Sequence, residues 1–227
     1  MSYSIASLCT KSIGQCQVVR ISSFRNMHPG AAATELYSHA DTIVVGKNAL
    51  IMHPYGRTFT VNGYDPSLGQ VKNLDIVSAQ VAYELPNSSD VVILNMNQCV
   101  HVPTMENNLL CPMQLQMNGF RLHENPKFQV GASTENDHSV TINSESGDQI
   151  RIPFCLRGVT SYFPTRKTTP DDRENALDEY NLTVINPNWD PHDTHYEDQE
   201  NIYLYQHDRF QIPPTRGEQR LFALCHT

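Results

Sequence analysis

One short segment, Tyr37-Ser38-His39-Ala40-Asp41, brings a phenol, a hydroxyl, an imidazole and a carboxylate within five residues. These are the groups that proteins use for acid–base and nucleophilic chemistry. Leu36 precedes the segment, and an apolar run at 43–45 follows it. Taken by themselves, Leu36 and Tyr37 also suit the end of a strand, and Ser38-His39 suits an ordinary turn, since short motifs arise often by chance.

A second polar cluster is the segment 189–198, WDPHDTHYED, which contains His192, His195, Asp190, Asp193 and Glu197. Imidazole and carboxylate groups can bind zinc. The spacing fits no standard helix-borne site, so we interpret the segment as a solvated acidic linker and predict no metal site.

A third candidate is Cys111, one of six cysteines in the sequence. We expect a small buried apolar residue there rather than a nucleophile, which would need a histidine partner that the sequence does not place.

The elements that would position the first segment are short strands. β-Branched and aliphatic runs recur at 42–45, 59–61, 74–77, 81–83, 91–94 and 149–152, and turn residues separate most of them. Such spacing predicts a mainly β fold, namely a small β-barrel or closed sheet. One short helix is expected at 109–117, and the expected core positions are Ile43, Val44, Val92, Leu94, Leu109 and Leu110.

The charge of the chain is concentrated in one stretch. Residues 171–200 hold ten Asp or Glu and one Arg, a local charge of −9, so the rest of the chain carries +1 of the total of −8. Residues 164–200 are also poor in aliphatic residues, so we predict a linker with little fixed structure there. The expected organisation is an N-terminal linker at 1–31, a domain at 32–160, and an acidic linker and tail at 161–227.

Several classes of protein are not indicated. The sequence has no cluster of Lys and Arg of the kind that binds nucleic acid, and no run of about 18 apolar residues that would span a membrane. The first residues lack the continuous apolar stretch of a secretory signal. The six cysteines form no CxxC pair, so free thiols in a reducing compartment are expected.

The segment 36–42 resembles the active-site loop of retropepsin-like aspartic proteases, in which an apolar residue precedes Asp-Ser/Thr-Gly-Ala. Other stretches are similar to the protease region of copia-type retrotransposon polyproteins: 61–65 and 76–83 to its flap-side strands, and 99–103, 108–115 (NLLCPMQL) and 126–128 to its closing segment. The resemblance covers about residues 33–160 and continues weakly through 189–192. It implies a closed β-barrel of retropepsin type with a disordered acidic extension.

The resemblance also assigns roles within the loop. Tyr37 stands at the position of the catalytic aspartate, Ser38 at the hydroxyl position, His39 at the glycine and Ala40 at the alanine. Asp41 stands at the second acid, which supports binding of the substrate backbone. This class of enzyme uses two carboxylates that share one proton around a water molecule, one from each copy of a homodimer. A phenol, which ordinarily titrates near pH 10, cannot take that part.

The sequence therefore predicts a retropepsin-like endopeptidase domain from a retrotransposon polyprotein that is catalytically inactive as written. If active, it would cleave a polyprotein peptide as a homodimer, with no cofactor and no nucleic-acid or membrane partner. A cytoplasmic location is expected, with virus-like particles as the alternative. Two other possibilities remain open: a peptide-binding or dimerisation module derived from the same fold, and an unrelated β domain.

Overall fold

The computed structural model describes residues 5–7, 19–21, 31–62, 69–86, 88–143, 147, 149–183 and 189–207. The chain divides into two units, residues 1–189 and 190–227. The first unit is built mainly from strands, as the sequence predicted. Among the helices of the described residues, none has the length and apolar character needed to cross a membrane.

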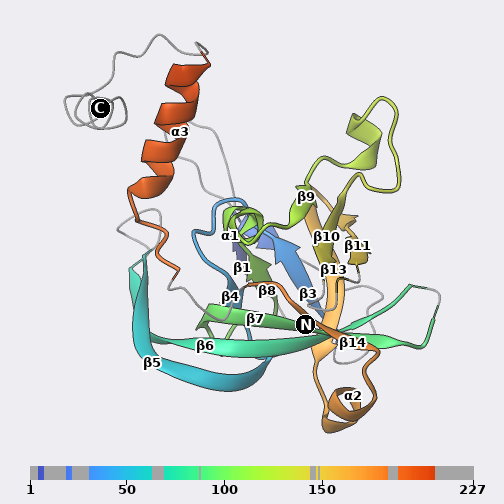
Figure 1. Ribbon diagram of the computed structural model, residues 1–227. Helices are drawn as coiled ribbons and strands as arrows, with labels where there is room; N and C mark the ends of the chain where they lie inside the picture. Colours follow the sequence, from blue (N-terminus) through green and yellow to red (C-terminus); the bar gives the residue numbers. More distant parts are fainter. Residues whose placement is uncertain are drawn as a thin grey trace. The chain divides into compact units, whose positions relative to one another are not determined.

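Figure 1 labels most elements of the first unit. The strands are β1 (Ile5–Ser7), β2 (Val19–Ile21), β3 (Ala31–Leu36), β4 (Val44–Val45), β5 (Leu50–Asn62), β6 (Gln70–Glu84), β7 (Val91–His101), β8 (Asn108–Leu110), β9 (Arg121–His123), β10 (Ser139–Asn143), β11 (Gln149–Pro153), β12 (Cys155–Arg157), β13 (Thr160–Lys167) and β14 (Asp178–Asn181). The helices are α1 (Pro112–Met117), a 3-10 turn at Lys127–Gln129, and α2 (Pro170–Asn175).

Nine of these strands form one sheet, in the order β12-β13-β3-β8-β4-β7-β6-β5, with β14 parallel to β7. β13 pairs with β3 and, through Arg166 and Lys167, also with β6. Hydrogen-bonded pairing therefore runs in a circuit through β13, β3, β8, β4, β7 and β6. A separate three-stranded sheet has the order β11-β10-β9, and β1 pairs with β2.

The longest pair of strands is the antiparallel β5–β6 hairpin, which bends along its length (Figure 1). Its register shifts between Ile51 and His53, between Pro54 and Thr58, and between Phe59 and Val61. Extra residues in one strand increase the local bend and twist of a hairpin. The sequence predicted separate strands at 74–77 and 81–83, but both lie within β6. The turn residues at 63–66, which separate the runs at 59–61 and 74–77 in the sequence, fall outside the described residues.

The core lies on the inner faces of these strands and against α1. Of the six predicted core residues, Ile43, Val92, Leu94 and Leu110 are at most 1% exposed, which confirms them. Val44 and Leu109 are only half-buried. They neighbour Ile43 and Leu110 in extended chain, where successive side chains point to opposite faces, so one residue of each pair faces inward.

The helix predicted at 109–117 is shorter than expected. Leu109 and Leu110 belong to β8, and α1 begins only at Pro112, after Cys111. The Cys111 side chain accepts a hydrogen bond from the backbone N–H of Gln114 at 3.3 Å and so caps the helix. Proline suits a first helical position because its missing N–H would have no partner inside the helix.

The predicted boundary of the domain at residue 160 is wrong. β13, α2 and β14 all lie beyond it, and Phe163 and Leu182 are fully buried in the same core as Leu110. The prediction relied on the high charge and low aliphatic content of this stretch. Burial of a few apolar side chains is nevertheless enough to hold a strand against the core. The expectation of little fixed structure is therefore corrected for residues 164–183.

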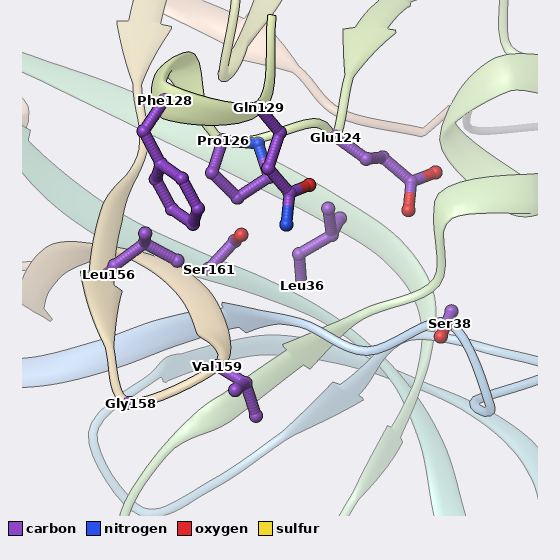
Figure 2. A pocket seen from close by; sticks show the side chains of 10 residues that line it. All are labelled: Leu36, Ser38, Glu124, Pro126, Phe128, Gln129, Leu156, Gly158, Val159 and Ser161. Atoms are coloured by element: carbon purple, nitrogen blue, oxygen red, sulfur yellow. The ribbon is translucent and has the colours of Figure 1, made fainter.

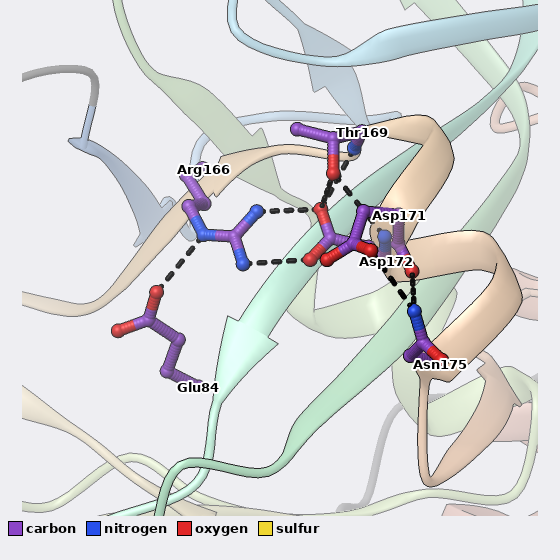
Figure 3. A network of polar contacts seen from close by, with 6 residues as sticks. All are labelled: Glu84, Arg166, Thr169, Asp171, Asp172 and Asn175. Atoms are coloured by element: carbon purple, nitrogen blue, oxygen red, sulfur yellow. Dashed lines mark hydrogen bonds and ion pairs between the residues drawn. The ribbon is translucent and has the colours of Figure 1, made fainter.

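Side-chain pairing explains how a charged stretch packs against the sheet. The guanidinium of Arg166 donates two hydrogen bonds to the Asp172 carboxylate, at 2.6 and 2.7 Å, and one to Glu84 at 2.9 Å. Thr169 and Asp172 form a reciprocal cap at the start of α2. Figure 3 shows this network, which joins α2 to β13 and β6.

The second unit contains one described element, α3 (His195–Gln206), inside the stretch predicted to be a linker. Its polar residues are spread around the helix, and none of its residues is buried. The prediction of a linker without fixed structure is therefore also wrong for 195–206, although the lack of burial agrees with its polar composition.

Candidate functional site

The predicted catalytic segment forms a loop at the end of β3. The backbone N–H of Tyr37 donates to the Leu110 carbonyl of β8 at 3.0 Å, and that of Ala40 donates to the Tyr37 carbonyl at 3.0 Å, which closes a turn. Tyr37 and Ala40 are half-buried, whereas Ser38, His39 and Asp41 are exposed. The loop therefore presents its polar side chains to solvent, while its two half-buried residues rest on the fold.

Two contacts bring three of the predicted site residues together. The Tyr37 and His39 rings lie 5.9 Å apart between centroids, and Ser38 Oγ lies 3.4 Å from His39 Nδ1. No hydrogen bond or ion pair reaches the Asp41 carboxylate within the described part of the chain. The loop thus offers a hydroxyl, an imidazole and a phenol, and its only carboxylate, that of Asp41, lies four residues beyond Tyr37.

The chain that leaves the loop and leads into β4 is held by hydrogen bonds to α1 and β7. Gln114 Oε1 accepts the backbone N–H of Ile43 at 2.9 Å, and the Ile43 carbonyl accepts from Val100 N at 2.9 Å. Gly46 follows, and a Cβ placed there would lie 2.4 Å from the Met105 carbonyl oxygen. A glycine is therefore needed where the chain leaves β4.

Buried polar side chains hold β3 in place behind the loop. Asn108 Oδ1 accepts from Gly46 N at 2.9 Å, and Asn108 Nδ2 donates to Thr34 Oγ1 at 3.2 Å. Thr34 also shares a 2.8 Å hydrogen bond with Thr165 of β13. Because unsatisfied buried polar groups are costly, this chain of bonds fixes the register of β3, β8 and β13.

A buried ion pair lies two residues before the loop. The Glu35 carboxylate accepts a hydrogen bond from Asn107 Nδ2 at 2.8 Å and another from Arg157. The Arg157 guanidinium also lies over the Tyr162 ring, 5.0 Å from its centroid. Sequence reasoning missed this group, since its members are 72 and 122 residues apart and no motif joins them.

A pocket of about 310 Å³ borders the loop. Figure 2 shows Phe128 and Leu156 on one side of this pocket and Glu124 and Ser38 on the other. The remaining lining residues are Leu36, Pro126, Gln129, Gly158, Val159 and Ser161. Because they come from β3, the 124–129 segment and the β12–β13 turn, only the folded chain assembles them.

Ser161 also contacts a histidine. Its Oγ lies 2.8 Å from Nε2 of the buried His138, whose ring packs 5.5 Å from that of Phe154. Burial lowers the pKa of His138, and Lys127 lowers it further, so both effects favour the neutral imidazole. Among the described residues no hydrogen bond reaches Nδ1, so the group that orients a catalytic imidazole is missing. We interpret the contact as structural.

The other candidate sites carry no chemistry in the described structure. His195 Nδ1 lies 2.9 Å from Asp193 Oδ1, but no group of three or more potential metal ligands gathers in the described residues. Cys111 is 1% exposed and burial raises its pKa, so a thiolate is disfavoured there. This agrees with the interpretation of Cys111 as a small buried residue.

Comparisons of the chain with family models, with curated proteins and with solved structures found no match.

Proposed function

We propose that this chain is a retropepsin-like domain of a copia-type polyprotein, and that it has no peptidase activity because residue 37 is a tyrosine. The observation that carries the proposal is the setting of Tyr37. It is the first residue after β3, its N–H is bonded to β8, and it opens an exposed turn. A carboxylate at this position would be held at the surface by backbone contacts, where a second copy could approach it.

The strand arrangement supports the finer description of the fold. The circuit of pairing through β13, β3, β8, β4, β7 and β6 is what a small closed β-barrel requires. The long β5–β6 hairpin suits the flap of such a protease, and NLLCPMQL spans β8 and most of α1, next to the loop. These features favour the retropepsin interpretation over an unrelated β domain.

Restoring the carboxylate tests the proposal. The chain as written, Tyr37→Asp and the control Tyr37→Asn would be incubated with unfolded casein between pH 4 and pH 7. We expect cleavage only by Tyr37→Asp, favoured at mildly acidic pH because one of the two carboxyls must stay protonated. A statine-type inhibitor, whose hydroxyl mimics the attacking water, should stop it.

Sedimentation measurements complete this test, because the site needs two copies of the loop. A dimer is expected for all three proteins. Cleavage by the unaltered chain that the inhibitor does not affect would contradict the proposal and indicate another nucleophile. A chain that stays monomeric at about 100 μM, with no cleavage by Tyr37→Asp, would also contradict it.

The pocket beside the loop favours a second candidate, a peptide-binding module. Phe128 is 77% exposed and Val159 is 99% exposed, and exposed apolar groups around a pocket are typical of binding surfaces. We expect N-acetylphenylalanine amide to shift the backbone NMR signals of 156–161, and N-acetylserine amide not to. Val159→Asp should abolish the shifts without unfolding the protein, because this side chain is almost fully in solvent. Equal shifts with both amides would exclude an apolar specificity.

A further inference from the structure

Trp189, the single tryptophan of the chain, makes two hydrogen bonds to distant parts of the first unit. Its indole Nε1 donates to the backbone carbonyl of Asp41 at 3.0 Å, and its backbone N–H donates to Gln98 Oε1 at 2.7 Å. The two partners are 148 and 91 residues away in the sequence. The bonded carbonyl belongs to the last residue of the 37–41 loop.

The bond to Asp41 completes the attachment of the loop. Its first residue is held by β8 through the bond from Tyr37 N to the Leu110 carbonyl. Its last residue is exposed, and the indole donor is what joins its carbonyl to the rest of the fold. A loop fixed at both ends loses fewer conformations when it binds a partner, so this attachment favours a preformed site.

The second bond connects the same tryptophan to Gln98 of β7 and, through that side chain, to the β5–β6 hairpin. Gln98 has a positive φ of 56°, close to the register shift between β6 and β7. Its Oε1 also accepts a hydrogen bond from Arg57 Nη2 of β5 at 3.3 Å. Gln98 Oε1 therefore accepts hydrogen bonds from both Trp189 and the hairpin, while the indole of Trp189 bonds to the loop.

From these contacts we infer that Trp189 is a positioning residue, which fixes the C-terminal end of the 37–41 loop and links it through Gln98 to the β5–β6 hairpin. Its importance for a protease-like site rests on the proposed function, but the attachment itself does not. The residue lies beyond the stretch that most closely resembles the protease region. The site thus depends on a segment that the sequence assigned to a linker.

Hydrogen exchange in the full chain tests the attachment without any activity. Trp189→Phe keeps an aromatic ring but removes the N–H donor. We expect the amides of Ala40 and Ile43 to exchange at least about ten-fold faster in this variant, because local opening of the loop becomes easier. The amides of Ile142 and Ile152, in the separate β9–β11 sheet, should be unchanged and would reveal any general loss of stability. Tyr203→Phe in α3 is the matched control, which should change neither set.

The indole proton gives a signature that a general structural role would not produce. The protein has one indole N–H signal, and its exchange should be slowed by the bond to the Asp41 carbonyl. Asp41→Asn should leave that protection intact because the acceptor is the backbone oxygen and not the carboxylate. An unprotected indole proton, or unchanged exchange at Ala40 and Ile43 in Trp189→Phe, would overturn the inference.

A cleavage assay separates this inference from the proposed function. In the Tyr37→Asp background, Trp189→Phe should lower kcat/KM, whereas Tyr203→Phe should not. If Tyr37→Asp shows no cleavage but Trp189→Phe still accelerates exchange in the loop, the positioning role stands and the protease assignment fails. If cleavage is restored and is insensitive to Trp189→Phe, the positioning role fails instead.

Discussion

The Asp172 carboxylate allows a quantitative test of where the folded unit ends. It accepts two hydrogen bonds from Arg166, at 2.6 and 2.7 Å, and two from Thr169, both at 2.7 Å. The side chains of Asp172 and Arg166 are 6% and 30% exposed. The change Asp172→Asn keeps the shape of the side chain but removes its charge, and it turns an N–H₂ group toward the guanidinium or toward Thr169.

The expected cost follows from this geometry. Breaking a buried ion pair costs roughly 3–5 kcal/mol. Water reaches part of Arg166, which also keeps its bond to Glu84, so the lower part of the range applies. We expect Asp172→Asn to lower the free energy of unfolding at pH 7 by about 3–4 kcal/mol. Asp171→Asn, one residue earlier and exposed, should cost less than about 1 kcal/mol, since an amide oxygen can still accept the hydrogen bond that Asn175 donates to this side chain at 3.0 Å, and the change removes a negative charge at the start of α2.

The pH dependence provides a second check. Hydrogen bonds from Arg166, and then from Thr169, hold the pKa of Asp172 well below its usual range although burial opposes them. A carboxyl whose pKa is lower in the folded than in the unfolded state stabilises fully above the unfolded pKa of about 3.9, and less as the pH falls below it. The difference between wild type and Asp172→Asn should therefore shrink by about 1 kcal/mol between pH 7 and pH 3.

Urea denaturation followed by circular dichroism at both pH values measures these differences. A cost at pH 7 no larger than that of Asp171→Asn would show that α2 does not pack on the sheet through this pair. A cost that is the same at pH 7 and pH 3 would show that the ionised carboxylate is not the stabilising group.

Three further predictions concern the core, the loop and the thiols. Leu110→Ala should lower the free energy of unfolding by roughly 2–5 kcal/mol in the same urea experiment, and Leu109→Ala should lower it by clearly less, because only Leu110 is fully buried. Equal costs for the two variants would contradict the packing of β8. Gly46→Ala should cost at least about 2 kcal/mol, since its Cβ would meet the Met105 carbonyl oxygen at 2.4 Å, and a melting temperature equal to that of wild type would disprove this close approach. Cys155 is exposed, whereas Cys99 and Cys111 are buried and have raised pKa values. Iodoacetamide at pH 7.5 should therefore modify Cys155 in the folded protein, and Cys99 and Cys111 only after unfolding. Peptide mass spectrometry of the treated protein measures the modification of each cysteine.

Local patterns in the sequence were sufficient to predict the class of fold and part of the core. β-Branched and aliphatic runs identified the strands at 91–94 and 149–152. The first run is continuously apolar, whereas the second shows the alternation of a strand with one buried face, which repeats every two residues. The same alternation explains why Ile43 and Leu110 were correctly assigned to the core while their neighbours Val44 and Leu109 are half-buried. The proteolytic identity of the 37–41 loop stays a prediction, since it depends on resemblance and on a homodimer.

Only the tertiary structure decided how the acidic stretch is used and which residues surround the loop. The charge of 171–183 suggested a linker, but Arg166 neutralises Asp172, and Phe163 and Leu182 supply the burial that fixes the segment. Trp189 reaches Asp41 across 148 residues. Such contacts leave no periodic signal in the sequence, because burial and charge pairing depend on which distant side chain arrives opposite each group when the sheet forms.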